Sequence, residues 1–382
     1  MQKLLIFNTK YKKYGGEDAN INEEIKFYKN FYKVSYLEVK NSSFNLYSIL
    51  ALFTLNNLEV NRRLKKSLDK FKPNYVYIHN TWFNSGLGIF NILYKKNIVP
   101  IVKVHNFRFE CSRYFLLKNH LKSKSVCEKC SKNTKSNLFF NKYFENSYLK
   151  SILLIFHSKK YFRILKESNI KVVCLNSFQK NYLINLGIDV AKLHILENPL
   201  PESSSPQVYN PQSNFVIYAG AIENNKGVFE LCSAWKEKKI DGLSLYIVGD
   251  GGQKEELQKN FESENIKFLG LLSNEDTLKL IKKARAVITA TKMYEVQPRL
   301  LNEASINSVP SIYPSFGGMD EYFPSGYDMS FKQYDYDSLK EKIDLLFNEK
   351  KLIENSEKVN NFLSKRLSTE SIIKKFKTIS KI

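Results

Sequence analysis

Short apolar runs alternate with longer helical stretches along the whole chain, and this alternation constrains the fold more than any other feature. In the first half, the runs that predict strands are residues 3–9, 33–39, 74–80, 99–106 and 171–177. In the second half they are residues 215–221, 243–251, 267–270, 286–291 and 310–315, with helices expected from about residue 335. Strands that alternate with helices form right-handed βαβ units, so each half is predicted to be an α/β domain with a doubly wound parallel sheet.

A segment rich in proline, serine and asparagine separates the two series of strands. It reads NPLPESSSPQVYNPQSN over residues 198–214, a composition typical of a linker. The chain is therefore predicted to contain a Rossmann-like domain, a linker, a second Rossmann-like domain and a C-terminal helix that can pack back on the first domain; these parts span residues 1–198, 199–213, 214–365 and 366–382. Ligands of such sheets bind at the carboxyl ends of the strands, so the expected site is the cleft between the two domains.

Basic residues are concentrated in the first half of the chain. The whole chain carries 59 Lys and Arg against 38 Asp and Glu, a formal charge of +21. Residues 1–198 hold 34 basic and 13 acidic residues, which accounts for all of that excess. The asymmetry suggests an anionic partner for this half, such as nucleic acid, an anionic membrane or a phosphorylated lipid. The alternative is a lysine-rich composition without any such partner.

An irregular, basic and aromatic insertion is predicted at about residues 107–160. It contains the runs RYFLLKNHLKSKSV and LFFNKYF, in which lysines are mixed with large aromatic side chains. This composition favours a membrane surface, where rings lie at the depth of the headgroups and lysines face anionic lipid. Single-stranded nucleic acid and a helical lid with a solvated charged face stay open as alternatives.

No apolar run reaches the roughly 18–20 residues of a membrane-spanning helix, and the first residues lack the apolar segment of a signal peptide. The expected location is therefore the cytoplasm, where the five cysteines would stay reduced. Cys111, Cys127 and Cys130 have the spacing C-x15-C-x2-C and are candidate zinc ligands, with His105 or His120 as a fourth. Free thiols in a loop are the alternative.

The stretch MYEVQPRLLNEA, residues 293–304, carries two glutamates, Glu295 and Glu303, separated by seven residues. It follows the predicted strand 286–291, so it lies at the ligand-binding edge of the second sheet. Pro298 suits the first turn of a helix expected over residues 299–307, because its missing N–H would be unpaired there. The free N–H groups at such a helix start attract an anion, to which Arg299 adds a bidentate contact. In isolation, the two glutamates would indicate no more than a polar helix start.

With its surroundings, this stretch resembles the family 4 retaining glycosyltransferases, whose two Rossmann-like domains form the fold called GT-B. The resemblance covers nearly the whole chain and rests on six segments in the order of that family. They are YGGED (14–18), VHN (104–106), YAGAIENNKGVFELCSAW (218–235), YIVGDGG (246–252), IKFLG (266–270) and the Glu-x7-Glu stretch that leads to GGMDEYF (317–323).

The resemblance implies which residues hold the donor. Glu295 would bind hydroxyls of the donor sugar, Glu303 would bind the ribose, and Lys226 would neutralise the diphosphate. The family usually has an arginine at the start of the diphosphate loop, where this chain has Ala221. Arg299 is the residue expected to replace that cation.

Further implied roles belong to three glycines and one histidine. Gly15 and Gly16 would let the backbone approach phosphates or sugar closely, because glycine has no Cβ. Gly249, in the segment GDGG, would contact the base through its backbone. His105, at the end of the fourth strand, would reach the transferring sugar or the acceptor. His79 also ends a strand, and a structural role is equally open for it.

These features predict a hexosyl- or N-acetylhexosaminyl-type transferase that uses a nucleotide-diphosphate sugar. The expected acceptor is a hydroxyl of a lipid-linked bacterial surface glycan, such as lipopolysaccharide, O-antigen or capsule, which places the protein at the inner face of the membrane. The resemblance implies same-face transfer that retains configuration, without a protein nucleophile, metal or other cofactor. The alternative is a non-catalytic GT-B protein that binds glycan or anionic lipid, and the missing arginine at Ala221 supports it. No specific nucleic-acid partner is expected, because a nucleic-acid-binding module is supported by charge alone.

Overall fold

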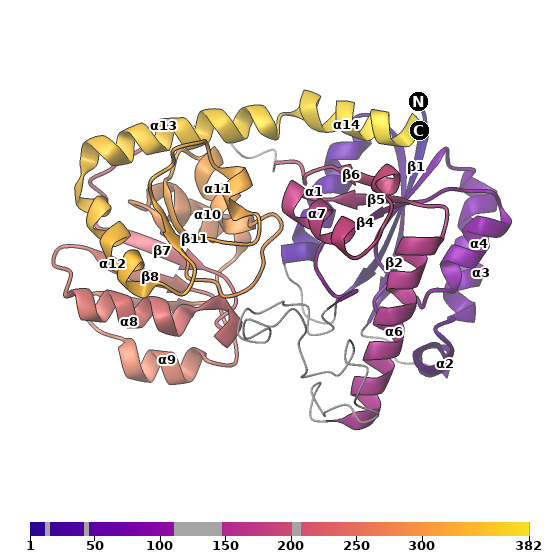
Figure 1. Cartoon of the computed structure of the whole chain (residues 1–382), viewed down its shortest axis with the longest axis horizontal. Coiled ribbons are helices and arrows are strands. Elements are labelled where there is room, and N and C mark those ends of the chain that lie inside the picture. Colours follow the sequence, from indigo (N-terminus) through magenta and orange to yellow (C-terminus); the bar gives the residue numbers. More distant parts are fainter. Residues whose placement is uncertain (12–15, 42–45, 111–146, 201–207, 382) are drawn as a thin grey trace. The chain divides into compact units, whose positions relative to one another are not determined.

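The computed structural model describes residues 1–11, 16–41, 46–110, 147–200 and 208–381, and the chain divides into two units (Figure 1). Unit 1 comprises Met1–Pro199 together with Thr369–Ile382, and unit 2 comprises Leu200–Ser368. Each unit is built around one six-stranded sheet in which all paired strands are parallel. Within the described ranges, no helix is both long and apolar enough to cross a bilayer.

The sheet of unit 1 has the strand order β2-β1-β3-β4-β5-β6. Its central strands are almost fully buried, as parallel strands are when both faces of the sheet are covered. The strands are β1 (Lys3–Lys10), β2 (Lys33–Lys40), β3 (Tyr75–Asn80), β4 (Ile101–Lys103), β5 (Lys171–Cys174) and β6 (Leu193–Ile195).

Several helices of unit 1 begin at residues that cap them. Asn57, Ser147 and Asn176 each precede a helix and accept a hydrogen bond from the backbone N–H three residues further on. The helices are α1 (Gly16–Lys29), α2 (Leu46–Thr54), α3 (Leu58–Phe71), α4 (Gly88–Lys95), α6 (Tyr148–Glu167), α7 (Ser177–Asn185) and α14 (Thr369–Lys381).

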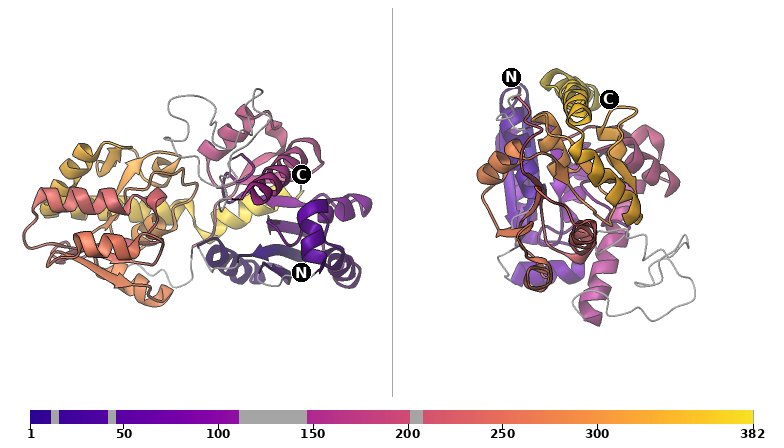
Figure 2. Two further views of the ribbon diagram at one scale, coloured as in Figure 1. Left: turned by 90° about the horizontal axis from the view of Figure 1, so that it is seen from below. Right: turned by 90° about the vertical axis from the view of Figure 1, so that its left-hand side faces the viewer.

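The C-terminal helix α14 belongs to unit 1 and can be followed in Figures 1 and 2. Phe376 is fully buried, and its ring centroid lies 4.6 Å from that of Tyr28 in α1 and 5.5 Å from that of Tyr77 in β3. Lys171 at the start of β5 donates a hydrogen bond from Nζ to the carbonyl of Ile379 at 2.9 Å. The last helix therefore completes an aromatic core that the first part of the chain begins.

The sheet of unit 2 has the strand order β12-β11-β10-β7-β8-β9. The strands are β7 (Phe215–Ala219), β8 (Ser244–Val248), β9 (Ile266–Gly270), β10 (Val287–Ile288), β11 (Ser311–Ser315) and β12 (Ser330–Lys332). The helices are α8 (Val228–Lys238), α9 (Lys254–Phe261), α10 (Asn274–Lys283), α11 (Arg299–Ile306), α12 (Tyr336–Asp344) and α13 (Glu349–Arg366), and the 3-10 turn η2 (Asn224–Lys226) precedes α8.

All ten predicted strands are present, but several of them are shorter than predicted. The strand expected at 99–106 covers only Ile101–Lys103, and the strand expected at 286–291 covers only Val287–Ile288. In both cases the residues that follow leave the sheet and form the loops at its carboxyl edge. The sequence does not predict β6 and β12, because strands of three residues are too short to show a period.

Candidate active site

The carboxyl-end loops of unit 2 approach one another closely at glycines. Gly249 follows β8 with φ +143°, and a Cβ at this position would lie 1.9 Å from the carbonyl oxygen of Gly220. Its N–H donates to the carbonyl of Gly270 at 2.8 Å. Gly227, with φ +69° at the start of α8, would place a Cβ 1.9 Å from the carbonyl oxygen of Ala290. The packing of these loops against one another therefore requires glycine at both positions. The contact of Gly249 with the nucleotide base of a donor stays a prediction.

Two of the predicted donor-binding residues, Lys226 and Glu295, lie together at this edge of the sheet. Lys226 ends the turn η2, and Glu295 lies in the loop between β10 and α11. Lys226 Nζ is 2.7 Å from Glu295 Oε1, and the two side chains keep 26% and 22% of their surface exposed. A partly exposed lysine that is paired with one carboxylate can exchange that partner for another anion.

The other predicted pair, Arg299 and Glu303, lies on the first turns of α11. Arg299 Nε is 2.6 Å from Glu303 Oε1, one helical turn away. The sequence predicts Pro298 in the first turn of the helix. In the structure its ψ of 103° is extended, so Pro298 directly precedes α11 instead. Its missing N–H still suits a helix start, and Arg299 is the first helical residue.

Lys292 is a second lysine close to Lys226 that the sequence does not single out. Its Nζ lies 2.8 Å from Glu230 Oε1 and also contacts Asn224 Oδ1, and its N–H donates to the carbonyl of Asn225. These contacts fasten the loop after β10 to the turn η2 that carries Lys226. In the sequence, Lys292 is marked only by its position two residues before Tyr294, which directly precedes Glu295.

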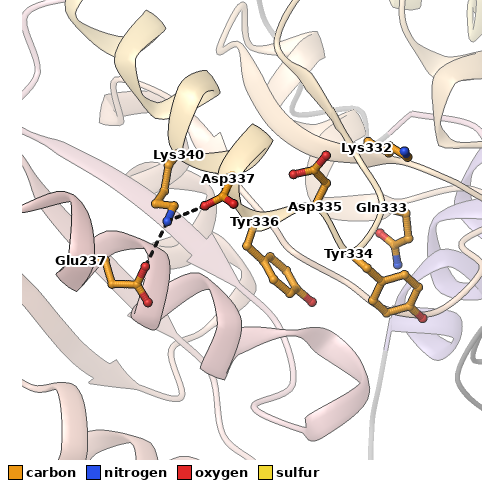
Figure 3. Close-up of a pocket in the computed structure, with 8 residues that line it drawn as sticks. All are labelled: Glu237, Lys332, Gln333, Tyr334, Asp335, Tyr336, Asp337 and Lys340. Carbon is orange, nitrogen blue, oxygen red and sulfur yellow. Dashed lines mark hydrogen bonds and ion pairs between the residues drawn. The ribbon is translucent and has the colours of Figure 1, made fainter.

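A hollow of about 480 Å³ on unit 2 contains the sequence Asp335-Tyr336-Asp337, a carboxylate pair of the kind that can bind a metal (Figure 3). Asp335 instead accepts a hydrogen bond from the Ser338 N–H at the start of α12. Asp337 lies 2.7 Å from Lys340 Nζ, which also lies 3.1 Å from Glu237. None of the predicted site residues lines this hollow, whose lining is Glu237, Lys332, Gln333, Tyr334, Asp335, Tyr336, Asp337 and Lys340.

Unit 1 contains a small cavity at the carboxyl ends of β3 and β4, and His105 lines it. Its volume of about 30 Å³ is enough for a water molecule or a single hydroxyl group. The walls come from α1, β3, the segment after β4 and α6. They consist of Glu17, His79, Asn80, Thr81, Trp82, Lys103, Val104, His105, Asn106, Arg108, Phe109, His157 and Tyr161.

Glu17 is a titratable carboxyl group in this cavity that the sequence does not predict as a site residue. The Tyr11 hydroxyl donates to its two oxygens at 3.3 and 3.2 Å, and Asn106 Nδ2 donates at 3.2 Å. The guanidinium of Arg108 lies over the rings of Tyr11 and Trp82. Burial raises the pKa of Glu17 to about 7, although the Arg108 charge opposes that shift. A carboxyl group that titrates near neutral pH can hold or release a proton in this cavity.

His79 and His105 form a pair whose ring atoms His79 Nδ1 and His105 Nε2 lie 3.0 Å apart. Behind them, Glu24 of α1 and Lys103 of β4 form a buried ion pair with 2.5 Å between Oε1 and Nζ. The sequence gives Lys103 only as a polar residue in an apolar strand and Glu24 as an acid in a helix. Lys103 and Glu24 are charged residues at positions where the hydrophobic period requires an apolar core residue. This mismatch is the sequence signal that identifies them.

His157 on α6 is the third histidine that lines the cavity, and its side chain is buried. Its ring centroid lies 4.6 Å from that of Trp82. Burial lowers the pKa of His157 to about 3, with a further contribution from the Arg108 charge, so the ring is neutral at physiological pH. No sequence pattern marks His157, because the helix that carries it is polar on several sides.

Some predicted residues are not informative in the structure. Gly15, Cys111, Cys127 and Cys130 lie outside the described residues, as does most of the insertion at about 107–160. Gly16 begins α1, and among the described residues no atom lies within 4 Å of the position that a Cβ would take, so their packing does not require glycine there. In the described part of the chain, no group of three or more His, Cys, Asp or Glu side chains is arranged to hold a metal ion.

The fold defines the class: the two parallel six-stranded sheets match those of GT-B glycosyltransferases, which confirms the predicted fold. The chain resembles the crystal structure of Anabaena Alr3699/HepE in complex with UDP and glucose, with a TM-score of 0.71, 12% identity and complete coverage of both chains. It also resembles the structure of WaaG, a glycosyltransferase involved in lipopolysaccharide biosynthesis, with a TM-score of 0.65, 12% identity, and coverage of 100% of this chain and 99% of WaaG. At these identities the likeness concerns the fold alone.

Sequence comparison gives a narrower result for unit 2. Residues 201–361 match the model of the family described as Glycosyl transferases group 1, so this unit carries a glycosyltransferase group 1 domain. The chain is also 28% identical over 149 residues to the amylovoran biosynthesis glycosyltransferase AmsD of Erwinia amylovora. That alignment covers 37% of this chain and 42% of AmsD, so the chain matches less than half the length of this relative.

Proposed function

We propose that this protein is a family 4 retaining glycosyltransferase that moves a sugar from a nucleotide-diphosphate sugar to a glycan hydroxyl. The observation that carries the proposal is the Lys226–Glu295 pair, at the carboxyl edge of a sheet whose sequence matches glycosyl transferases group 1. AmsD, which is similar in sequence, and WaaG, which is similar in fold, are glycosyltransferases, and the HepE structure contains UDP and glucose.

The donor would bind by exchanging the partners of two ion pairs. Lys226 would turn from Glu295 to the diphosphate, and the Glu295 carboxylate would then accept hydrogen bonds from hydroxyls of the donor sugar. Arg299 would likewise turn from Glu303 to the diphosphate, and Glu303 would accept from both ribose hydroxyls. Each exchange gives the cation a new anionic partner and leaves the carboxylate hydrogen-bonded to hydroxyl groups, so the new contacts offset the cost of separating the ion pair.

The proposed chemistry is the departure of the diphosphate from the anomeric carbon. Negative charge grows on the leaving phosphate oxygen, and Lys226, Arg299 and the N–H groups at the start of α11 would stabilise it. The acceptor hydroxyl attacks from the face that the diphosphate leaves, and the leaving phosphate oxygen takes its proton, which retains configuration. His105 and the cavity of unit 1 would hold hydroxyl groups of the transferring sugar or of the acceptor. The transferred group would be a hexose or an N-acetylhexosamine.

The acceptor is proposed to be a lipid-linked glycan of bacterial surface polysaccharide, handled at the inner face of the membrane. The charge of residues 1–198 supports attraction to anionic lipid. Helix α6 adds a row of exposed apolar side chains, Tyr148, Leu149, Ile152 and Phe156. Exposed rings and aliphatic side chains beside lysines suit the headgroup region of a membrane.

A non-catalytic protein that binds glycan or anionic lipid is the second candidate. Ala221 favours it, because the side chain that the family usually places there would add a second cation at the diphosphate. In the structure, Arg299 is paired with Glu303, so its contribution to a diphosphate depends on the exchange described above.

The test begins with a thermal-shift screen of the full chain against UDP- and GDP-sugars, because a bound donor raises stability in proportion to ln(1 + [L]/Kd). A donor that stabilises the protein is then supplied with lipid-linked glycan acceptors, and the product is identified by mass spectrometry with its anomeric configuration determined by NMR. Lys226→Ala should abolish the shift. Lys340→Ala is the matched control, since this lysine of unit 2 is also ion-paired and has a similar exposed fraction of 28%. Donor binding without any transfer product would favour the non-catalytic candidate.

A further inference from the structure

We propose that the buried carboxylate of Glu24 and the imidazole of His79 fix the ring proton of His105 on Nδ1, so that His105 acts as a hydrogen-bond donor to the substrate. The inference deepens the proposed function, on which the substrate contact rests. Glu24 and His79 are positioning residues, since both act through His105.

The four groups form a chain from the core of unit 1 to the cavity. Lys103 Nζ contacts Glu24 Oε1, and both side chains are completely buried. Glu24 Oε2 lies 3.3 Å from His79 Nδ1, which lies 3.0 Å from His105 Nε2. The two imidazole rings are stacked at an interplanar angle of 24°. Helix α1, strands β3 and β4 and the segment after β4 each supply one member, so the chain depends on the tertiary fold.

Both histidines are neutral and therefore carry one ring proton each. Burial lowers the pKa of His79 and of His105 well below the usual range, and the Lys103 charge acts in the same direction. Only one proton can lie between His79 Nδ1 and His105 Nε2. The hydrogen bond between these atoms therefore has a direction, and that direction decides the tautomer of both rings.

Two observations place this proton on His79 Nδ1. First, Glu24 Oε2 is close to this atom, and a carboxylate attracts an N–H but repels the lone pair of a bare nitrogen. Although 3.3 Å is close enough for attraction, Glu24 Oε2 makes no hydrogen bond of good geometry with any described residue, which leaves the N–H of His79 to His105. Second, His79 Nε2 is buried with no hydrogen-bond partner among the described residues. A bare acceptor there costs less than an orphaned N–H donor.

The tautomer of His105 follows from that of His79. Because His105 Nε2 accepts the hydrogen bond, the single proton of His105 lies on Nδ1. No hydrogen bond to this Nδ1 is recorded in the described part of the chain, and His105 is partly exposed in the cavity lining. His105 thus offers an N–H to an oxygen atom of the substrate and has no free nitrogen lone pair with which to act as a base.

The Lys103 ammonium favours the charged form of Glu24 in this buried position. Burial raises the pKa of Glu24, and the attraction of the Lys103 ammonium opposes the shift. Without that cation, Glu24 would take up a proton and lose its preference for an N–H on His79.

The tautomers can be measured in the full chain by NMR, independently of any activity. The protein is labelled with 15N-histidine, and its five histidines are assigned with single His→Gln variants. Two-bond 1H–15N correlations distinguish protonated from bare ring nitrogens. We expect His105 with a protonated Nδ1 and a bare Nε2, and His79 with a protonated Nδ1. A protonated Nε2 on His105 would overturn the proposal.

The double variant Glu24→Leu with Lys103→Met tests the source of this preference. It replaces a buried ion pair by apolar side chains of similar size, a change that folded proteins tolerate better than the loss of one partner. We expect mixed tautomers at His105 and a turnover about tenfold lower, the equivalent of one lost hydrogen bond, with the Kd of the sugar-free nucleotide diphosphate unchanged. An unchanged Nδ1–H pattern in this variant would show that Glu24 does not set the tautomer.

Val172→Ala is the matched control for a general loss of packing. Val172 is fully buried in β5 and lies beside Val102 of β4, but it is not part of the histidine chain. It should lower the melting temperature and leave both the tautomers and turnover unchanged; altered tautomers here would mean that the NMR pattern reports packing only. A wild-type protein with the expected tautomers but no sugar transfer would instead overturn the proposed function.

Discussion

The two units hold their polar groups in opposite ways. In unit 1, the side chains of Glu24, Lys103 and His79 have no exposed surface, whereas the ion pairs of Lys226 and Arg299 in unit 2 keep between 18% and 26% of each side chain exposed. A buried charge depends on its one partner, because separation leaves it without solvent. A partly exposed charge can change partners at little cost. The difference teaches that the cations of unit 2 are suited to bind and release an anion, while the ions of unit 1 are suited to fix geometry.

Stability should show the largest difference between the units. Lys103→Met leaves the Glu24 carboxylate buried without its cation, and we expect it to lower the free energy of unfolding by about 3–5 kcal/mol. Lys226→Met removes an exposed pair and should cost about 0–1 kcal/mol. Urea denaturation of both variants measures the two losses. If both variants lost the same free energy of unfolding, the buried pair of unit 1 and the partly exposed pair of unit 2 would not differ in how strongly each charge depends on its partner.

The pH dependence of stability should identify Glu17 as a buried acid of unit 1. Its pKa of about 7 in the folded protein lies above its value in the unfolded chain, so its contribution to stability is complete below about pH 4.5 and is lost as pH rises through 7. Glu17→Gln resembles the protonated form at every pH. Relative to wild type, this variant should gain at most about 3 kcal/mol between pH 4.5 and 8, because its side chain is only partly buried. A constant difference across this range would mean that Glu17 titrates normally.

Turnover should be sensitive to Arg299 in unit 2 if this residue stabilises the leaving diphosphate. A lost charge-assisted hydrogen bond costs about 1.5–3 kcal/mol, so Arg299→Ala should lower kcat roughly ten- to a hundred-fold. Arg299→Lys should recover part of the loss, since lysine cannot make the planar fork. The double variant Ala221→Arg with Arg299→Ala should regain activity, because it restores a cation at the usual position of the family. Wild-type kcat in Arg299→Ala would leave Lys226 and the helix start as the groups that act on the diphosphate.

The smallest effect is expected at the surface of α6. Phe156→Ser removes a half-exposed ring and should weaken binding to vesicles that contain anionic lipid by about 1 kcal/mol, roughly fivefold. Phe347→Ser in unit 2 is the control, because Phe347 is 53% exposed and Phe156 is 50% exposed. Vesicle sedimentation at low salt measures both. Equal weakening by the two changes would show that binding does not distinguish the units.

The sequence predicts correctly that three candidate residues of unit 2 lie at one edge of its sheet, because they are close together in the chain. Glu295, Arg299 and Glu303 lie within nine residues, and the strand before them fixes the edge of the sheet at which they lie. What the sequence could not show is that the predicted cations and acids pair with each other, since Lys226 and Glu295 are 69 residues apart. Their pairing depends on the order of strands in the sheet.

In unit 1 the sequence predicts His105 as a site residue and leaves the role of His79, which also ends a strand, open. The other neighbours of His105 come from α1 and α6, and nothing in the sequence indicates that Glu24 and His157 approach the same strand end. The strand pattern shows which residues are buried, but a buried histidine or glutamate has the same pattern whether it is structural or part of a site. The distances between these side chains are needed to decide between the two.

The return of α14 to unit 1 has a consequence for synthesis of the protein on the ribosome. Unit 2 is one continuous segment and can fold as soon as it has emerged, whereas unit 1 needs a helix that is translated about 170 residues after the rest of it. Until then, Tyr28 and Tyr77 lack the ring of Phe376 that covers them. The nascent first half therefore carries an open aromatic surface through the whole translation of the second half, and a chain that stops before residue 369 leaves that surface exposed to chaperones and proteases.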